Sequence, residues 1–201
     1  MQGEQFSSGF TDLNPNQKIP ALYHYTKDHE KPVRVFESAN IVLYLAEHFP
    51  EGRTYFPEVD RVEILNWVFW LQGVAPYIGG MFGHFFHYAP VEIEYAITRS
   101  TIELKRIYHV LDRHLEGKTW MISERLSIAD FVVAPWFHAV PMNYKNSGEF
   151  AELHKYKNVE KWLARWRALP SVIRGQRVNG FGRDALVERH SKDDFSKASS
   201  L

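Results

Sequence analysis

The sequence predicts an α+β segment at the N-terminal end, followed by an all-helical domain, in a chain of 201 residues. Two short β-type runs, at 18–25 and 33–38, flank the polar stretch TKDHEKP and predict a hairpin. From Pro57 onward this signal disappears, and apolar residues recur with helical spacing. The length allows one large domain or two small ones. The change of pattern favours two parts, 1–52 and 57–180, with a polar tail at 181–201.

Composition excludes several classes of function. The 24 basic residues balance the 24 acidic ones, so charge gives no reason to expect a nucleic-acid partner. The longest apolar run is interrupted by Gln72, Pro76 and His84, and the chain does not begin with a signal-peptide pattern. We therefore expect a cytoplasmic protein without a membrane partner. Because cysteine is absent, any sulfur chemistry must come from a ligand.

Pro20 lies where the first β-type run leaves a polar turn. Proline has no backbone N–H, so this residue must occupy a sheet edge, a bend or a cis peptide. The second run is followed by an amphipathic helix at 39–49, with Ser38 as the predicted N-cap residue. The predicted apolar face of this helix comprises Val42, Leu45, Ala46 and Phe49.

Helices are predicted throughout 57–180. The first begins at Glu58, and Gly73 and Pro76 should kink or interrupt it. The second runs from 90 to 117. Its predicted buried stripe comprises Ile93, Ala96, Ile97, Ile102, Ile107, Val110 and Leu111. In the third, at 128–140, Ser127 and Asp130 are predicted to form a capping box. Two short helices at 158–169 and 170–176 complete the expected domain.

The order of the motifs resembles that of the soluble glutathione transferases. NPNQKIPAL comes first, FESANIVLYLAE follows, and an all-helical half containing SIAD completes the order. The stretches QFSSGF, FWLQGVAPYIGGMFGHFFHYAP and EYAITRSTIELKRIYHVLD are similar to the Nu-class and Ure2-like glutathione disulfide oxidoreductases. The resemblance implies a glutathione-transferase architecture, in which 1–52 is the C-terminal part of a truncated thioredoxin-like, glutathione-binding domain.

The resemblance also implies which residues bind glutathione. In the family, the proline of KIPAL is cis, and the backbone of the preceding residue pairs with the cysteinyl part of glutathione. These positions are Pro20 and Ile19, and an exposed strand edge suits a peptide ligand. Glu37 and Ser38 would hold the γ-glutamyl end, where a helix start favours an anion. The remaining candidate contacts are Gln5, Lys18, Arg99 and Arg106.

The beginning of the chain departs from the family pattern. A complete member begins with a strand–helix–strand unit, and its thiol-stabilising Thr, Ser, Tyr or Asn follows the first strand. Such a unit takes roughly 30 residues, whereas only MQGE precedes Gln5. We expect the thiol-stabilising residue in a missing N-terminal segment, so no catalytic residue is assigned in this chain.

Simpler roles compete with each of these assignments. Pro20 could be only an edge-strand proline, and Glu37 a solvated charge at a strand end. Ser38 is explained by helix capping alone, although a ligand role is compatible with a cap. Arg99 and Arg106 lie on a charge-rich helix, so surface placement explains them as well as ligand contact does.

The aromatic run HFFHY also allows different interpretations. His84 and His87 have a spacing that could coordinate a metal, but no third ligand is evident, so we expect no metal site. The wall of an apolar substrate pocket suits the composition better, and core packing is an equal alternative. The predicted pocket residues are Phe82, Phe85, Phe86 and Tyr88.

The resemblance therefore implies a glutathione-dependent transferase or disulfide oxidoreductase with glutathione as co-substrate. Its partner would be a small-molecule disulfide, reduced by thiol–disulfide exchange, or an electrophile that is conjugated. The resemblance further implies a homodimer. The alternative is a non-catalytic glutathione-transferase-like module for dimerisation or scaffolding. The missing first unit favours this alternative, and the retained KIPAL and FES motifs disfavour it.

Overall fold

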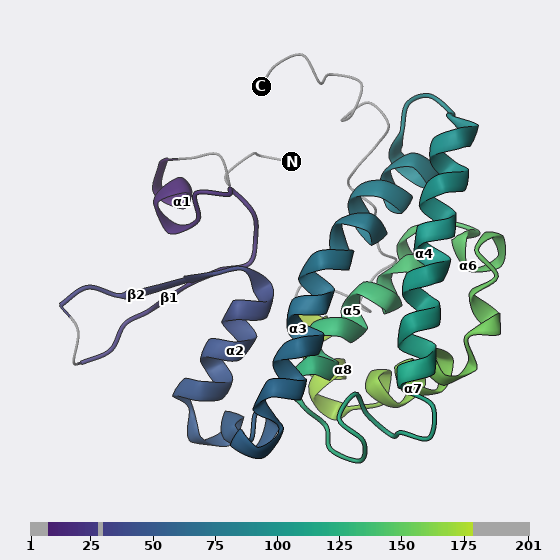
Figure 1. The fold of residues 1–201 in the computed structure, drawn as a ribbon. Coiled ribbons are helices and arrows are strands. Elements are labelled where there is room, and N and C mark those ends of the chain that lie inside the picture. The colour runs from purple at the N-terminus through teal and green to yellow at the C-terminus, as the bar shows by residue number, and fades with distance from the viewer. Residues whose placement is uncertain (1–7, 28–29, 179–201) are drawn as a thin grey trace.

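The computed structural model describes residues 8–27 and 30–178, and it places a small N-terminal part beside a larger helical part (Figure 1). The N-terminal part consists of α1 (Ser8–Leu13), β1 (Ala21–His24), β2 (Val33–Phe36) and α2 (Ser38–His48). The helix α1 was not predicted, because its six residues, SGFTDL, are too few for a helical period to be recognised.

The two strands form the predicted antiparallel hairpin. Ala21 lies opposite Phe36, and His24 lies opposite Val33. The apolar face predicted for α2 is only partly correct. Ala46 is buried, but Leu45 and Phe49 are exposed, although α2 packs against η2, α5 and the hairpin.

Two 3-10 helices, η2 (Pro50–Tyr55) and η3 (Glu58–Asp60), connect the two parts. The long helix that follows changes character at the predicted place. It is an α-helix, α3, over Arg61–Pro76, and it continues as a π-helix, η4, over Tyr77–Tyr88. Proline cannot donate the backbone hydrogen bond of a regular α-helix. Pro76 therefore marks the residue at which the α-helical pattern ends.

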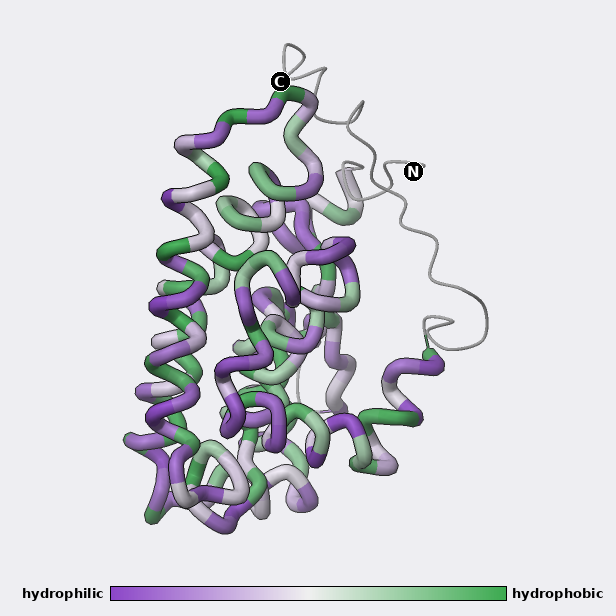
Figure 2. The backbone as a smooth tube through the Cα atoms, turned by 90° about the vertical axis from the view of Figure 1, so that its right-hand side faces the viewer, coloured by the Kyte–Doolittle hydropathy of each residue, from purple (hydrophilic) through white to green (hydrophobic). Residues whose placement is uncertain are grey.

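The next helix, α4, covers Glu94–His114 and so begins four residues later than predicted. Figure 2 shows hydrophilic and hydrophobic residues alternating along the long helices, as amphipathic packing requires. Within the predicted stripe, Ile107 and Leu111 are completely buried, but Ile93 and Ile102 are exposed. The prediction was wrong at these two positions. The buried face of α4 instead contains Leu104 together with Ile107 and Leu111, which recur with the helical period.

The remaining elements are α5 (Ile128–Asn143), α6 (Ser147–Phe150), η5 (Leu153–Lys155), α7 (Lys157–Arg167) and α8 (Pro170–Val178). The helix α5 packs against α2, α3 and α7, so it is the central element of the helical part. None of the helices in the described ranges is long and apolar enough to span a membrane.

The predicted capping box at the start of α5 is confirmed, and it is also a junction of the core. The Asp130 carboxylate accepts hydrogen bonds from the backbone N–H groups of Ser127 and Met121, each at 2.9 Å. It also accepts a 2.8 Å bond from Nε1 of Trp162 on α7. One buried side chain therefore connects the helix start, the preceding loop and a neighbouring helix.

Candidate functional site

The register of the hairpin brings two separate sequence motifs to one end of the sheet. Pro20 immediately precedes Ala21, and Glu37 immediately follows Phe36, the residue opposite Ala21. The Ile19–Pro20 peptide is cis, as the resemblance implied. Ile19 itself is 79% exposed. The structure thus places Ile19, Pro20, Glu37 and Ser38 at the same end of the hairpin.

Asn14, which the sequence analysis did not assign, supports this arrangement. Its side chain is buried, and its Nδ2 donates a 2.7 Å hydrogen bond to the Lys18 carbonyl. Its Oδ1 accepts a 2.9 Å bond from the backbone N–H of Asn16, which forms an Asx turn. The turn therefore fixes the backbone just before Ile19. The run Asn14-Pro15-Asn16 is a turn signal from which this role could have been inferred.

The start of α2 has free donors and an unusual backbone. Glu37, and not Ser38, is the N-cap residue, and it has φ 69° and ψ 121°. The prediction of Ser38 as the cap was therefore wrong by one position, because Ser38 already has helical geometry. The Glu37 side chain makes no capping hydrogen bond, and the first turn contains no acidic residue. The first helical N–H groups are consequently available to an anion.

Positive φ at a residue other than glycine is uncommon, and such strain concentrates at ligand sites. Both Glu37 and Ser38 are exposed. An exposed glutamate has many alternatives to a strained conformation, so its backbone must be set by the strand before it and the helix after it. The result is a turn in which one carboxylate, one hydroxyl and the helix-start amides lie close together along the chain.

The other predicted ligand contacts differ in where they lie. Lys18 is exposed beside Ile19, and Gln5 lies outside the described residues. Arg99 and Arg106 lie on α4, which packs against η4 and α7, whereas α2 packs against α5. Both arginines form ion pairs with Glu103, at 3.4 Å for Arg99 and 2.6 Å for Arg106. The pairing lowers the pKa of Glu103, first through its hydrogen bond to Arg106.

The structure separates the four predicted pocket aromatics. Phe82 is completely buried and stacks on Phe86 with ring centroids 5.0 Å apart, so Phe82 belongs to the core. Phe85 and Phe86 line a cavity of about 470 Å³ beside the start of α4. Tyr88 packs edge-to-face on Tyr144 at 5.8 Å. The core alternative thus holds for Phe82, and a pocket wall is available only at Phe85 and Phe86.

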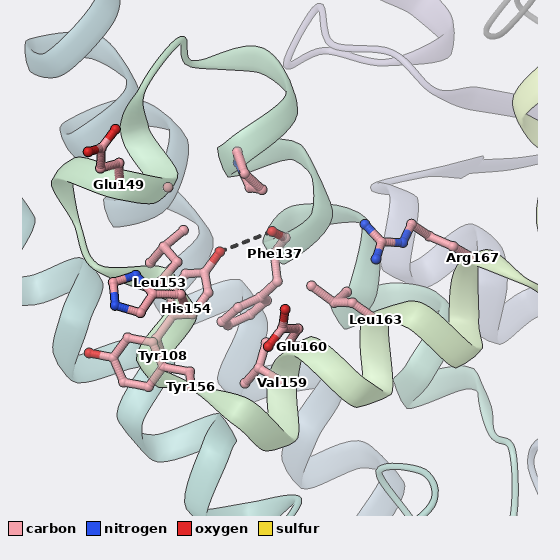
Figure 3. Close-up of a pocket in the computed structure, with 12 residues that line it drawn as sticks. Tyr108, Phe137, Glu149, Leu153, His154, Tyr156, Val159, Glu160, Leu163 and Arg167 are labelled. Atoms are coloured by element: carbon pink, nitrogen blue, oxygen red, sulfur yellow. Dashed lines mark hydrogen bonds between the residues drawn. The ribbon is translucent and has the colours of Figure 1, made fainter.

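Another cavity, of about 430 Å³, lies between α4, α5 and α7 (Figure 3). Its floor is aromatic, and the hydroxyl of Tyr108 is directed to the Phe137 carbonyl at 3.0 Å. The Tyr156 hydroxyl donates to the Lys105 carbonyl. Both tyrosine hydroxyls are therefore satisfied by the protein. A third cavity, lined by Ile78 and Trp136, lies between η4 and α5.

Metal ligands are not clustered in the part of the chain that the structure describes. Within 8–27 and 30–178, no group of three or more His, Asp or Glu side chains is placed to hold a metal ion. His87 packs on Tyr88 and Tyr144 with ring centroids 4.8 and 5.7 Å apart. These contacts assign His87 to the aromatic packing around η4.

Comparisons with known proteins identify the family of this chain. Residues 84–170 match the family model "Glutathione S-transferase, C-terminal domain". The disulfide-bond oxidoreductase YghU of Escherichia coli is 48% identical over 200 residues, which cover 96% of this chain and 67% of that protein. The chain therefore belongs to the glutathione S-transferase family.

Solved structures give the same assignment. The glutathione transferase YghU from Streptococcus pneumoniae, complexed with glutathione, superposes with a TM-score of 0.80 at 43% identity, covering 88% of this chain and 67% of that one. A glutathione transferase from Burkholderia graminis has two glutathione molecules bound per subunit. It superposes with a TM-score of 0.80 at 32% identity, covering 90% of this chain and 75% of that one.

Proposed function

We propose that this chain is a glutathione-dependent disulfide oxidoreductase that binds glutathione at the turn formed by Ile19, Pro20, Glu37 and Ser38. The observation that carries the proposal is the register of the hairpin, which joins an open strand edge to uncapped helix-start amides. The first feature suits the peptide backbone of glutathione, and the second suits its γ-glutamyl carboxylate. In this proposal, 1–52 supplies the glutathione-binding part and 57–180 the helical part.

The proposed reaction uses two glutathione molecules for each disulfide. The thiolate of bound glutathione attacks one sulfur of the substrate, forms a mixed disulfide and releases one substrate thiolate, which takes a proton. A second glutathione thiolate attacks the glutathione sulfur of the mixed disulfide and releases the other substrate thiolate. The products are glutathione disulfide and two substrate thiols. The pair of glutathione molecules in the Burkholderia graminis structure supports this stoichiometry.

The chain's own residues bind and orient the co-substrate in this scheme. Ile19 pairs with its backbone, and Asn14 keeps the preceding carbonyl in place. Ser38 and the helix start fix the carboxylate end. Since the chain has no cysteine, no protein thiol competes in the exchange. Conjugation to an electrophile would use the same bound thiolate.

A coupled assay tests this function. Reduction of bis(2-hydroxyethyl) disulfide by glutathione should be accelerated by the chain, and formation of glutathione disulfide should match disulfide consumed one to one. Ser38→Ala should lower the rate by about tenfold by removing a hydrogen bond to a charged group. Glu116→Ala, a change at an exposed residue of the helical part, is the control and should leave the rate unchanged. No acceleration by a folded chain would support the scaffold alternative.

We also propose that the protein is a cytoplasmic homodimer. An exposed apolar stripe on α3 supports the dimer, because Val62 and Phe69 share one helical face, and Phe69 is 66% exposed. Tyr77, eight residues beyond Phe69 at the start of η4, is also exposed and lies near Arg106 of α4. A second copy of the chain, related by a two-fold axis, would cover this stripe.

The oligomeric state tests the dimer directly. Phe69→Arg places a charge in the stripe and should convert a dimer into a monomer in sedimentation analysis. Phe150→Arg changes an aromatic residue of similar exposure on α6 and should leave the dimer intact. A monomeric unmodified chain would contradict the proposal.

A further inference from the structure

The cavity of about 470 Å³ beside the start of α4 lies at the top of the helical part in Figure 1. Its lining comes from the end of η4, the segment that joins η4 to α4, the first residues of α4, and Phe150 at the end of α6. It shares no residue with the turn at Ile19, Pro20, Glu37 and Ser38. A ligand in this cavity would therefore be additional to glutathione in the proposed reaction.

Three phenylalanine rings line this cavity, and part of their surface is open. The Phe86 and Phe150 rings belong to different elements, and their centroids lie 4.8 Å apart. Phe150 is 50% exposed, and Phe85 and Phe86 are partly buried. The face of an aromatic ring carries negative electrostatic potential and attracts a cation. The rings therefore offer both apolar contact and a preference for positive charge.

Two glutamates, Glu92 and Glu94, line the same space, and both are exposed. Neither forms an ion pair with another residue of 8–27 or 30–178. By contrast, Glu103 and Glu152 each pair with two basic side chains. The two carboxylates at the cavity therefore remain available to a cation from outside the chain.

The charges that line this cavity differ from those of its neighbours. Among the described residues, no lysine or arginine lines it, and His87 belongs to the aromatic packing around η4. The cavity between α4, α5 and α7 has both signs of charge, since Arg167 lines it together with Glu149 and Glu160. The cavity between η4 and α5 is lined by no charged side chain of the described residues. Charge complementarity therefore favours a positively charged ligand beside α4.

The chemistry of the lining also indicates what kind of cation fits. Two carboxylates among aromatic rings supply too few oxygen ligands for a metal ion such as Ca²⁺, which takes six to eight. A quaternary ammonium group needs no hydrogen-bond acceptor, and aromatic faces recognise it directly. Its methyl groups also suit apolar neighbours, which Val91 and Ile97 provide here.

We propose that this cavity binds a small organic cation with a quaternary ammonium head. The charged nitrogen lies between the carboxylates of Glu92 and Glu94 and the phenylalanine rings. The methyl groups on the nitrogen contact the rings and the Ile97 side chain.

Nuclear magnetic resonance of the isoleucine methyl groups tests this proposal on the full chain. The probe is choline, and the Ile97 signal is identified by its loss in Ile97→Val, which keeps most of the side chain. We expect a saturable shift of the Ile97 signal that persists at a saturating concentration of glutathione. The matched probe, 3,3-dimethylbutan-1-ol, has the shape of choline with carbon in place of the charged nitrogen. It should bind at least tenfold more weakly.

Variants of exposed residues separate recognition from a general effect of charge. Glu92→Gln should weaken choline binding by about two- to fivefold, as expected for one exposed charge pair. Phe150→Leu keeps an apolar side chain and should weaken it by a similar factor, because the ring face is lost. Glu149→Gln removes the same charge next to Phe150, at an exposed residue that lines the other cavity, and should leave the affinity unchanged.

The proposal has four outcomes that would overturn it. The Ile97 signal could remain unchanged with choline, or the neutral alcohol could bind as tightly as choline. Glutathione could displace choline, which would merge the two sites. Finally, Glu92→Gln and Phe150→Leu could both retain the affinity of the unmodified chain.

Discussion

The two parts of the molecule use a buried polar side chain for different purposes. In the helical part, Asp130 accepts hydrogen bonds from a loop, a helix start and Trp162, so it joins elements that are distant in sequence. In the N-terminal part, the Asn14 side chain bonds to Asn16 and to the Lys18 carbonyl, and it shapes one turn. The comparison fits our proposal, in which the helical part supplies stability and the N-terminal part presents an exposed edge to glutathione.

The largest effect is expected at Asp130. Asp130→Ala would leave several buried donors without an acceptor, and each costs about 1–3 kcal/mol, so we expect a loss of about 3 kcal/mol or more in the free energy of unfolding. Urea denaturation measures this. Glu116→Ala, at an exposed position, should change the same quantity by less than about 0.5 kcal/mol. If Asp130→Ala lowered the free energy of unfolding no more than Glu116→Ala does, the proposed contrast between the two parts would be contradicted.

Asn14→Ala should have a smaller and local effect. Loss of its bond to the Lys18 carbonyl frees the turn, so amide hydrogen exchange in β1 should accelerate by about tenfold. The amides of α5 should keep their exchange rates. Equal acceleration in both elements would mean that the two parts unfold together. Glutathione binding should also weaken, because Ile19 is no longer held in place.

The pH dependence of stability should arise in the helical part. Burial, the largest cause, lowers the pKa of both His114 and His138 from the ordinary value of 6.5. The unfolded chain therefore takes up protons first as pH falls, so stability contributed by these groups is present above about pH 6.5 and is lost below it. Thermal midpoints across this range should decline on acidification. In His114→Gln the decline should be shallower, and an unchanged slope would contradict this account.

Glu37→Gly should give the smallest change in stability, and in the opposite direction. Glycine adopts φ 69° without the steric cost that glutamate has there, so we expect a gain of about 0.5–1 kcal/mol. Affinity for glutathione should fall, because one carboxylate is removed from the turn. Calorimetric unfolding and ligand titration of the same variant measure the two effects. A variant that is less stable would show that the Glu37 backbone is not strained.

Residue patterns predicted much of the fold but less of the site. The hairpin, the change at Pro76 and the Ser127–Asp130 capping box follow from local chemistry that acts within a few residues. The exposure of Ile102 and the burial of Asn14 depend on neighbouring elements, which spacing alone does not determine. The positive φ of Glu37 has no sequence signal, because it is imposed by the junction of β2 with α2.

The site residues illustrate the same limit. Ile19, Pro20, Glu37 and Ser38 were grouped through the family resemblance, and the strand register places them together. Arg99 and Arg106 were grouped with them on the same basis, yet each is bonded to Glu103 on its own helix. Such i,i+3 and i,i+4 pairs are local and can be predicted from spacing. A contact between α4 and the hairpin would join distant parts of the chain, so spacing cannot predict it.

The most direct test is a calorimetric titration of the folded chain with reduced and oxidised glutathione, alongside Ser38→Ala. If the N-terminal part presents a binding edge on a helical support, the unmodified chain should bind glutathione saturably, and Ser38→Ala should bind about tenfold more weakly with unchanged stability. A folded chain that binds neither form of glutathione would contradict this central claim.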